Sequence, residues 1–557
     1  MISAHQLRRT FGDRVALDAF SVEVSPGEIF GLVGPDGAGK TTAIRILTGV
    51  LAPSGGSAVV DGYDVVKEAD ALKDHIGYMS QRFGLYADLT VLENLSFYAD
   101  IYEVPRVGRE ERIAQLLGFS QLTPFKQRLA GNLSGGMKQK LGLACALIHT
   151  PRVLFLDEPT NGVDPVSRRD FWRILYQLVR DGVTLFVSTA YLDEAERCNR
   201  LALMHQGRIL AIGSPDEVRR ETDGTWWRNG SQAPEATRTV GSPQPPAVEV
   251  HALEKRFGSF RAVDGISFSV QPGEIFGFLG PNGAGKSTTI RMLCGLLAPS
   301  AGTGRVAGFD VVADTERIKG RIGYMSQKFS LYDELTVEEN IDFYSGIYRV
   351  PRDRKRSRKD WVLQMAGLTE HRHSRTSELA AGWKQRLALG CALLHEPPVV
   401  FLDEPTSGVD PDSRRRFWEL IRELAAGGVT VFVTTHYMEE SEYCDRLGVI
   451  YRGRLIALGT PGELKRTHMA DAVLDVRCAR PSEAMGLVER EPGVKEVALF
   501  GRGLHVVTAE PARLLTALPA RLRGEGFGPC EVARIEPTLE DVFVSLIEAH
   551  DRKVGAP

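Results

Sequence analysis

With 557 residues, the chain is long enough for several domains rather than one. A hydrophobic content of 43% and a charged content of 25% are ordinary for globular proteins and exclude a largely disordered chain. The formal net charge of -3 provides no overall basicity that would direct the chain to nucleic acid.

The N-terminal segment MISAHQLRRTFG lacks the apolar core of a secretory signal, and no apolar run approaches the roughly 18 residues that span a bilayer. Any role at a membrane is therefore expected to come through a partner chain. The seven cysteines are scattered without a CxxC pair, which favours buried reduced thiols over a disulfide framework or a zinc site.

The sequence contains an internal repeat, with two copies of one domain. Landmarks such as Gly34 and Gly280, or Gln81 and Gln327, are separated by one constant offset of 246 residues. We predict a first domain over residues 1–221, a linker over 222–246, a second domain over 247–468 and an α+β appendage over 469–557. The linker is rich in Gly, Pro, Ser and Thr, which predicts a flexible connection.

Each domain begins its chemistry with a glycine-rich loop, GPDGAGKT in the first copy and GPNGAGKS in the second. Each loop follows an apolar strand-like run and precedes a helix-like one, the context in which backbone N–H groups surround phosphate oxygens. Lys40 and Lys286 are predicted to reach the β and γ phosphates of a nucleotide, and Thr41 and Ser287 to help hold magnesium. The predicted nucleotide-binding residues of the loops are Gly34, Pro35, Asp36, Gly37, Ala38, Gly39, Lys40, Thr41 and Thr42, with Gly280, Pro281, Asn282, Gly283, Ala284, Gly285, Lys286, Ser287 and Thr288.

Further along, VLFLDEP and VVFLDEP are buried-strand runs that end in two carboxylates. Asp157 and Asp403 suit magnesium, directly or through water. Glu158 and Glu404 suit a general base or a residue that positions water for attack on the γ-phosphate.

Two other stretches carry less specific signals. The basic run PRDRKRSRKDW, residues 351–361, is either a solvated helix face or a surface that meets anionic lipid or a permease. The appendage alternates strand-like runs (AVLDVRC, EVALFG, LHVVTA, CEVARI) with helical ones (PSEAMGLVER, PARLLTALPARL) and ends in a helix around LEDVFVSLIEAH. It is a dimerising or regulatory module, or a cover for the second domain.

From about residue 3 to residue 468 the sequence resembles the ATP-binding cassette ATPases, through their full ordered set of motifs. The resemblance implies two P-loop NTPase nucleotide-binding domains in tandem, each an α/β fold with a RecA-like core, an antiparallel β subdomain and an α-helical subdomain. It implies ATP and Mg²⁺ as ligands. The residues that match the family's motifs are Phe11 and Phe257 for adenine stacking, Gln81 and Gln327 for magnesium, Ser134, Gly135 and Gly136 for the signature LSGG, Asp164 and Asp410 for the D-loops, and His436 for the switch histidine.

In this family two cassettes pack head to tail, so that each ATP lies between the glycine-rich loop of one and the signature of the other. The second signature reads LAAG, with Ala380 and Ala381 before the surviving Gly382, and Ala190 stands at the first switch position. The resemblance places all these losses on one composite site, the one built on the first loop. We therefore expect an asymmetric ATPase with one site that binds without turning over; the alternative is neutral drift in a slow but working site.

The stretches FGLY and FSLY follow both glutamines, where the family's transport subunits dock. Phe83, Tyr86, Phe329 and Tyr332 are the predicted coupling residues, although a place in the core explains them equally well. Other motifs, including PTLEDVF near the C-terminus, resemble the ABC-2 branch, which exports drugs or ions through two permease subunits and in some systems a periplasmic adaptor. The resemblance implies a chain at the cytoplasmic face of the inner membrane.

Three other functions remain to be distinguished. A two-cassette translation factor is expected to join its cassettes by a long charged helical arm, which residues 222–246 do not resemble. A tandem sugar importer usually degenerates at other positions. A DNA-repair ATPase would need a coiled-coil insertion or a zinc hook, and neither is present in the sequence.

Overall fold

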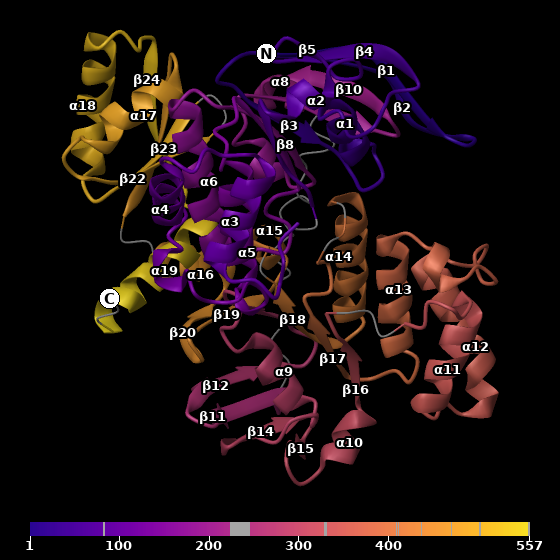
Figure 1. Ribbon diagram of the computed structural model, residues 1–557. Helices are drawn as coiled ribbons and strands as arrows, with labels where there is room; N and C mark the ends of the chain where they lie inside the picture. Colours follow the sequence, from indigo (N-terminus) through magenta and orange to yellow (C-terminus); the bar gives the residue numbers. More distant parts are fainter. Residues whose placement is uncertain are drawn as a thin grey trace. The chain divides into compact units, whose positions relative to one another are not determined.

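The computed structural model describes residues 1–81, 84–222, 245–327, 331–407, 409, 411–435, 437–468, 471–500 and 503–554 (Figure 1). Contacts divide the chain into two compact units. The first unit contains Met1–Asn229 and Ala470–Glu536, and the second contains Gly230–Met469 and Pro537–Pro557. Most of the predicted linker, residues 223–244, lies outside the described part of the chain.

The first repeat is built on a six-stranded sheet in the order β10-β9-β3-β8-β7-β6 and a four-stranded antiparallel sheet in the order β2-β1-β4-β5. Strands β6, β7, β8, β3 and β9 run parallel, and β10 is antiparallel to β9. The strands are β1 (Ile2–Phe11), β2 (Arg14–Val24), β3 (Ile29–Val33), β4 (Gly55–Val60), β5 (Tyr63–Asp64), β6 (Ile76–Met79), β7 (Val153–Asp157), β8 (Thr184–Thr189), β9 (Arg200–His205) and β10 (Arg208–Gly213).

Helices surround these sheets, and the segment between β6 and β7 forms a separate helical region. The helices are α1 (Lys40–Leu47), α2 (Ala69–Lys73), α3 (Val91–Ile101), α4 (Arg109–Phe119), α5 (Gly135–Ala146), α6 (Pro165–Arg180), α7 (Leu192–Ala195) and α8 (Pro215–Glu221), with short 3-10 turns η1 (Thr123–Phe125) and η2 (Ala130–Asn132). Every residue of β3, β7 and β8 is buried, as central parallel strands covered on both faces should be. These strands therefore end in an ordered edge that can carry functional side chains.

The second repeat has the same architecture, with sheets ordered β16-β17-β18-β13-β19-β20 and β12-β11-β14-β15. Its strands are β11 (Val248–Phe257), β12 (Phe260–Val270), β13 (Ile275–Leu279), β14 (Ala301–Val306), β15 (Phe309–Asp310), β16 (Ile322–Met325), β17 (Val399–Asp403), β18 (Thr430–Thr435), β19 (Arg446–Tyr451) and β20 (Arg454–Gly459). Its helices are α9 (Lys286–Leu293), α10 (Thr315–Lys319), α11 (Val337–Ile347), α12 (Arg352–Ala366), α13 (Ala381–Ala392), α14 (Pro411–Ala426), α15 (Met438–Ser441) and α16 (Pro461–His468), with one 3-10 turn, η3 (Thr376–Glu378).

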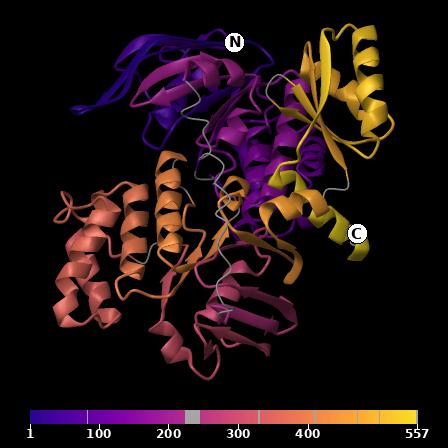
Figure 2. The same ribbon diagram turned by 180° about the vertical axis from the view of Figure 1, so that it is seen from behind.

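The C-terminal region does not form a separate body. Ala470–Glu536, which we call the C-terminal module, folds as β-α-β-β-α-β with the strand order β22-β23-β21-β24, the split βαβ arrangement of ferredoxin-like folds. Figures 1 and 2 show it in orange and yellow beside the first repeat, with which it shares one hydrophobic core. Its elements are β21 (Ala472–Cys478), α17 (Pro481–Glu489), β22 (Val494–Phe500), β23 (Gly503–Thr508), α18 (Pro511–Gly524) and β24 (Cys530–Ile535).

The last helix, α19 (Leu539–Val554), belongs to the second unit and packs on α15, α16 and β20. Its apolar side chains Val542, Phe543 and Ile547 are buried. The appendage predicted from the sequence is therefore shared between the two units.

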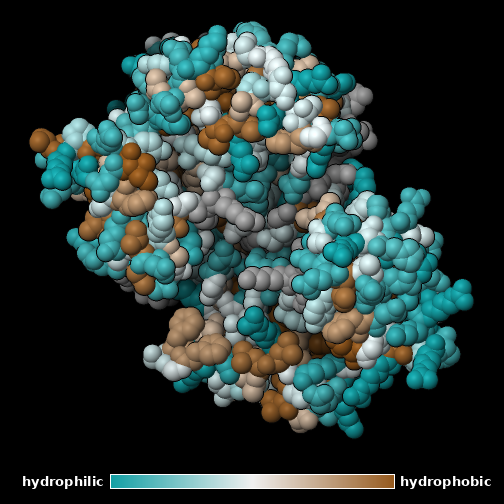
Figure 3. Space-filling model, turned by 45° about the vertical axis from the view of Figure 1, so that its right-hand side comes forward, coloured by the Kyte–Doolittle hydropathy of each residue, from teal (hydrophilic) through white to brown (hydrophobic). Residues whose placement is uncertain are grey.

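The predicted basic run forms the first part of α12, where ion pairs join three of its six cations to acids of the same unit. Arg354 and Arg358 both contact Glu396, and Lys359 lies 2.9 Å from Glu338. These pairs support a solvated helix face whose positive charge is partly neutralised. Hydrophilic side chains cover most of the surface visible in Figure 3, with hydrophobic ones in small separate groups.

No helix within the described residues combines the length and the apolar composition required to cross a bilayer. All seven cysteines carry free thiols, and five of them are buried.

Candidate nucleotide-binding sites

The glycine-rich loop of the first unit turns from β3 into α1. Gly39 immediately before the helix has φ of 105°, a conformation that favours glycine, and a Cβ there would lie 2.5 Å from the carbonyl oxygen of Ala16. Lys40, only 4% exposed, donates hydrogen bonds to the carbonyl oxygens of Gly34 at 2.7 Å and Pro35 at 3.1 Å. The loop therefore holds its lysine in place before any ligand arrives.

Two carboxylates stand at the end of β7, beside this lysine. Glu158 lies 3.1 Å from the Lys40 ammonium and accepts a hydrogen bond of 2.8 Å from the amide nitrogen of Gln81. Its φ of 49° is unusual for a residue with a side chain and marks a backbone held by its surroundings. The glutamate is thus fixed between an amide donor and a cation.

Asp157 is almost completely buried and accepts hydrogen bonds from Ser188 at 2.6 Å and from Thr41 at 3.2 Å. Burial raises the pKa of Asp157, and the two hydroxyl groups oppose that shift. Both bonds reach Oδ1, while the buried Oδ2 has no hydrogen-bond partner in the described part of the molecule.

These oxygens fit a hydrated divalent cation. A carboxylate oxygen without a partner, the Thr41 hydroxyl and the Gln81 amide oxygen are hard donors of the kind that Mg²⁺ accepts. Gln81 uses its amide nitrogen on Glu158, which leaves its oxygen for such a ligand.

The first-unit residues surround a pocket of about 530 Å³. Its lining comprises Phe11, Arg14, Ala16, Asp36, Gly37, Gly39, Lys40, Thr41, Thr42, Gln81 and Glu158. Phe11, 49% exposed, lines the same cavity as Lys40 and Glu158, so that an aromatic side chain and a phosphate-type cradle share it.

The second unit repeats this geometry. Lys286 donates to Gly280 O at 2.7 Å and Pro281 O at 3.3 Å and lies 3.3 Å from Glu404. Gln327 donates to Glu404 at 2.9 Å.

Asp403 makes hydrogen bonds that correspond to those of Asp157. It accepts hydrogen bonds from Ser287 at 3.2 Å and Thr434 at 2.7 Å, and burial raises its pKa. Phe257, 51% exposed, occupies the position of Phe11.

Sequence reasoning did not identify the hydroxyl groups of Ser188 and Thr434 or the lining residue Arg14. Ser188 reaches Asp157 because β7 and β8 are parallel with these two residues in register. The motif TLFVSTA and its twin TVFVTTH place a hydroxyl at this position in both copies, which was the available signal.

The two signatures also differ in how they cap the helix that follows them. Ser134 is the N-cap of α5, where its hydroxyl accepts a hydrogen bond of 3.3 Å from the Met137 N–H. Ala380 occupies the same position before α13, and no side chain caps that helix. The serine therefore has a helix-capping role in addition to any contact with phosphate.

The last glycine of each signature, Gly136 or Gly382, has a packing role. A Cβ on Gly136 would lie 2.5 Å from the side chain of Ser167, and one on Gly382 would lie 2.5 Å from that of Ser413. Retention of Gly382 in LAAG follows from this close approach of helices.

Asp164 caps α6 by accepting a hydrogen bond of 3.1 Å from the Ser167 N–H, and Ala190 is buried at the end of β8. Tyr86 and Tyr332 are 49% and 45% exposed, so they are partly available at the surface. The predicted residues Phe83, Phe329, Asp410 and His436 lie outside the described residues.

Two family models match parts of this chain. The family model described as "ABC transporter" matches residues 17–161 and 263–407. A second model, described as "AAA domain, putative AbiEii toxin, Type IV TA system", matches residues 384–440.

Among curated proteins, the chain is 43% identical over 538 residues to the "Probable multidrug ABC transporter ATP-binding protein YbhF" of Escherichia coli (strain K12), covering 82% of this chain and 93% of that protein. It is 35% identical to the "Linearmycin resistance ATP-binding protein LnrL" of Bacillus subtilis (strain 168), covering 54% of this chain and 97% of that protein. It is 36% identical to the "Daunorubicin resistance ATP-binding protein DrrA3" of Streptomyces coeruleorubidus, covering 55% of this chain and 98% of that protein.

Among solved structures, the complex of archaeal ribosomal stalk protein aP1 and ribosome recycling factor aABCE1 contains a chain with a TM-score of 0.61 and 20% identity, covering 94% of this chain and 98% of that one. At this identity the likeness concerns the fold alone.

Proposed function

Since the chain belongs to the ABC transporter family of ATP-binding proteins, we propose that it powers an ABC-2 type exporter that removes drug-like small molecules from the cell. It is a tandem-cassette ATPase that hydrolyses ATP for transport. The printed functions of the relatives, multidrug transport and resistance to linearmycin or daunorubicin, support small-molecule efflux as its task.

The observation that carries the catalytic part of the proposal is the glutamate held between lysine and glutamine in each unit. A nucleotide phosphate placed in the loop competes with Glu158 for Lys40. The glutamate is then released to orient water and accept its proton, while the lysine stabilises charge on the phosphate. Glu404 and Lys286 take the same roles in the second unit.

Asp157 with Thr41 and Gln81, and Asp403 with Ser287 and Gln327, would hold Mg²⁺. When bound, the cation would neutralise phosphate charge. The aromatic faces of Phe11 and Phe257 would stack on adenine.

The two sites differ in what completes them. We propose that each cassette's signature completes the site of the other, so that Ala380, Ala381 and Ala190 all fall on the site built around Lys40. Loss of one preorganised donor at a transition state costs a factor of ~10²–10³ in rate. The first site then binds ATP without hydrolysing it. The second site hydrolyses its own ATP, and it is completed by Ser134, Gly135, Gly136 and the switch residue His436.

Transport requires membrane permease subunits, of which this proposal includes two. The half-exposed side chains of Tyr86 and Tyr332 would contact them. Through these subunits the chain would work at the cytoplasmic face of the membrane. The D-loop residues Asp164 and Asp410 would link the sites.

The test is steady-state ATP hydrolysis by Glu158→Gln and Glu404→Gln, with ATP binding measured for each variant. We expect Glu404→Gln to lose nearly all activity and Glu158→Gln to retain most of it. Equal losses in the two variants would contradict the assignment of a single hydrolytic site.

A further inference from the structure

We propose that the C-terminal module recognises the first cassette through charged residues, three of which are acidic or uncharged in the second cassette, and that this docking holds the two cassettes together when no nucleotide is bound. The module follows the second cassette in sequence but packs on the first, after which the chain returns to the second unit as α19. The chain thus passes between the units at residues 229–230, 469–470 and 536–537.

The principal contacts are ion pairs with α6. Glu496 of the module lies 2.8 Å from Arg169 and 3.1 Å from Arg173. Glu496 and Arg169 are only 13% and 15% exposed, so this pair is largely shielded from water, whereas Arg173 is 46% exposed. Glu489 adds a third pair, 3.2 Å from Arg180. Shielded pairs that share one carboxylate are stronger and more selective than isolated surface pairs.

Apolar side chains line the same hollow as these charged ones. Met485 and Val497 of the module, together with Ile174 of α6, line a hollow of about 400 Å³. The same hydrophobic cluster continues from the first cassette's helices into the module's core. Apolar contact supplies affinity, and the surrounding charges select the partner.

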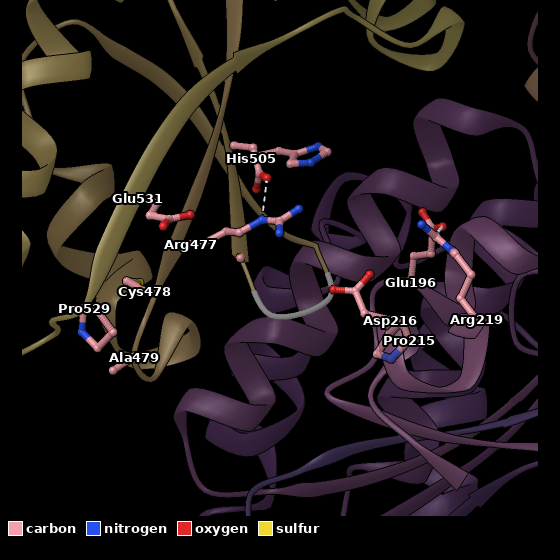
Figure 4. Close-up of a pocket in the computed structure, with 12 residues that line it drawn as sticks. Glu196, Pro215, Asp216, Arg219, Arg477, Cys478, Ala479, His505, Pro529 and Glu531 are labelled. Carbon is pink, nitrogen blue, oxygen red and sulfur yellow. Dashed lines mark hydrogen bonds and ion pairs between the residues drawn. The ribbon is translucent and has the colours of Figure 1, made fainter. Parts of the chain in front are cut away.

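A second contact region lies at the open face of the module's sheet, opposite α8 (Figure 4). Here Arg477 lies 3.0 Å from Asp475, and Asp216 of the first cassette also contributes to raising the pKa of Arg477. The region encloses a pocket of about 630 Å³ with charged side chains on both sides. The module and the first cassette each contribute an arginine and acids to the pocket, and the attraction between Asp216 and Arg477 acts across it.

The internal repeat shows why the second cassette does not offer the same surface. At the constant offset, Arg173 becomes Glu419, Arg180 becomes Ala426 and Asp216 becomes Gly462. Arg169 is retained as Arg415, so on α14 Glu496 would face one arginine and one glutamate, and Glu489 would face an alanine. The like charge at Glu419 disfavours the second copy, so we expect the module to prefer the first copy.

The terminal helix shows the opposite preference. Asp551 of α19 accepts hydrogen bonds from the Tyr451 hydroxyl at 3.0 and 3.1 Å and lies 3.2 Å from Arg452. In the first cassette these two positions are His205 and Gln206. The C-terminal region therefore has two docking sites: the module contacts the first cassette, and α19 contacts the second.

A protease site inserted in residues 222–246 of the full-length protein tests the proposal. After cleavage, without nucleotide and with EDTA, the two fragments are separated by gel filtration. We expect the wild-type fragments to elute together. The dissociation constant of the two fragments should rise at least tenfold after Glu496→Arg, or after Arg169→Glu with Arg173→Glu.

Combining Glu496→Arg with Arg169→Glu and Arg173→Glu should restore co-elution, which a variant that merely misfolds would not do. The matched control is Arg415→Glu, the counterpart of Arg169 in the second cassette, which should leave co-elution unchanged. The proposal is wrong if the wild-type fragments separate on cleavage, or if charge reversal at Glu496 leaves them together. ATP hydrolysis by the uncleaved variants is measured separately, so the result does not depend on the proposed function.

Discussion

Asp157 and Asp403 show how individual residues in this molecule are set for function at a cost to stability. Each is buried at the end of a strand, and burial raises its pKa above the usual value. An acid with a raised folded-state pKa destabilises the fold when it is ionised, and this destabilisation disappears as the pH falls through that pKa. At neutral pH the buried charge therefore favours unfolding until a cation or its waters compensate it.

Asp157→Asn should accordingly stabilise the protein without a ligand. The amide oxygen can still accept from Ser188 and Thr41, while the buried charge is gone. We expect urea denaturation at pH 7 to show a gain of about 1 kcal/mol, within the range of stabilising changes at active sites, together with loss of ATP hydrolysis. The gain should shrink in acid, where wild-type Asp157 is protonated. Asp403→Asn is the matched variant, and lower stability of both at pH 7 would contradict this account.

At the residue scale, the sequence predicted site residues where the groups have distinctive chemistry, and their role in nucleotide binding stays a prediction. The lysines and carboxylates were identified because a glycine-rich loop before a helix and an acidic pair after an apolar strand are rare combinations. Ser188 was not, because a serine in a strand looks ordinary until the register with β7 places it beside Asp157.

Among the elements, α5 and α13 form a pair that differs at its first residue. The Ser134 hydroxyl caps α5, whereas α13 begins at Ala380 without a side-chain cap. An N-cap serine stabilises a helix by ~0.5–2 kcal/mol relative to alanine. The second signature helix should consequently fray more readily at its first turn.

Ala380→Ser should slow amide hydrogen exchange in the first turn of α13, and Ser134→Ala should accelerate it in α5 by a similar factor. A cap worth ~1 kcal/mol corresponds to about a fivefold change in the opening equilibrium. Exchange followed by mass spectrometry on peptides from residues 133–140 and 379–386 measures both. Unchanged exchange in both peptides would mean that the cap bond is not populated in solution.

Prediction of elements from local pattern succeeded in the C-terminal region. The strand-like runs AVLDVRC and CEVARI are β21 and β24, and PARLLTALPARL lies in α18. The attachment of this module to the first cassette was not predicted, because it depends on charges on α6 that are distant in sequence from Glu496. Alternation and periodicity carry no information about such a partner.

At the scale of the whole molecule, the predicted tandem α/β fold and ATPase activity are confirmed, while the division of labour between the cassettes stays a prediction. The geometry around each lysine is nearly identical in the two units. Any functional asymmetry must therefore arise from what completes each pocket.

Lys286→Ala should abolish transport and single-turnover hydrolysis at saturating ATP. Lys40→Ala should leave most of the single-turnover rate and weaken ATP-driven association of the cassettes. Rapid-quench assays on the two variants, with nucleotide binding measured in parallel, distinguish these effects. If Lys40→Ala alone removed hydrolysis, the two sites would have to be exchanged in the proposal.

The contrast between the arginines of α6 and the glutamate and alanine of α14 also bears on how a duplicated gene can diverge. In a symmetric homodimer every substitution appears twice, so a change that impairs one interface impairs its symmetry mate. Once the duplicated halves are one chain and Glu496 distinguishes Arg173 from Glu419, each copy has a fixed identity. A substitution such as serine to alanine in one signature is then inherited by one site only, and the two halves can specialise independently.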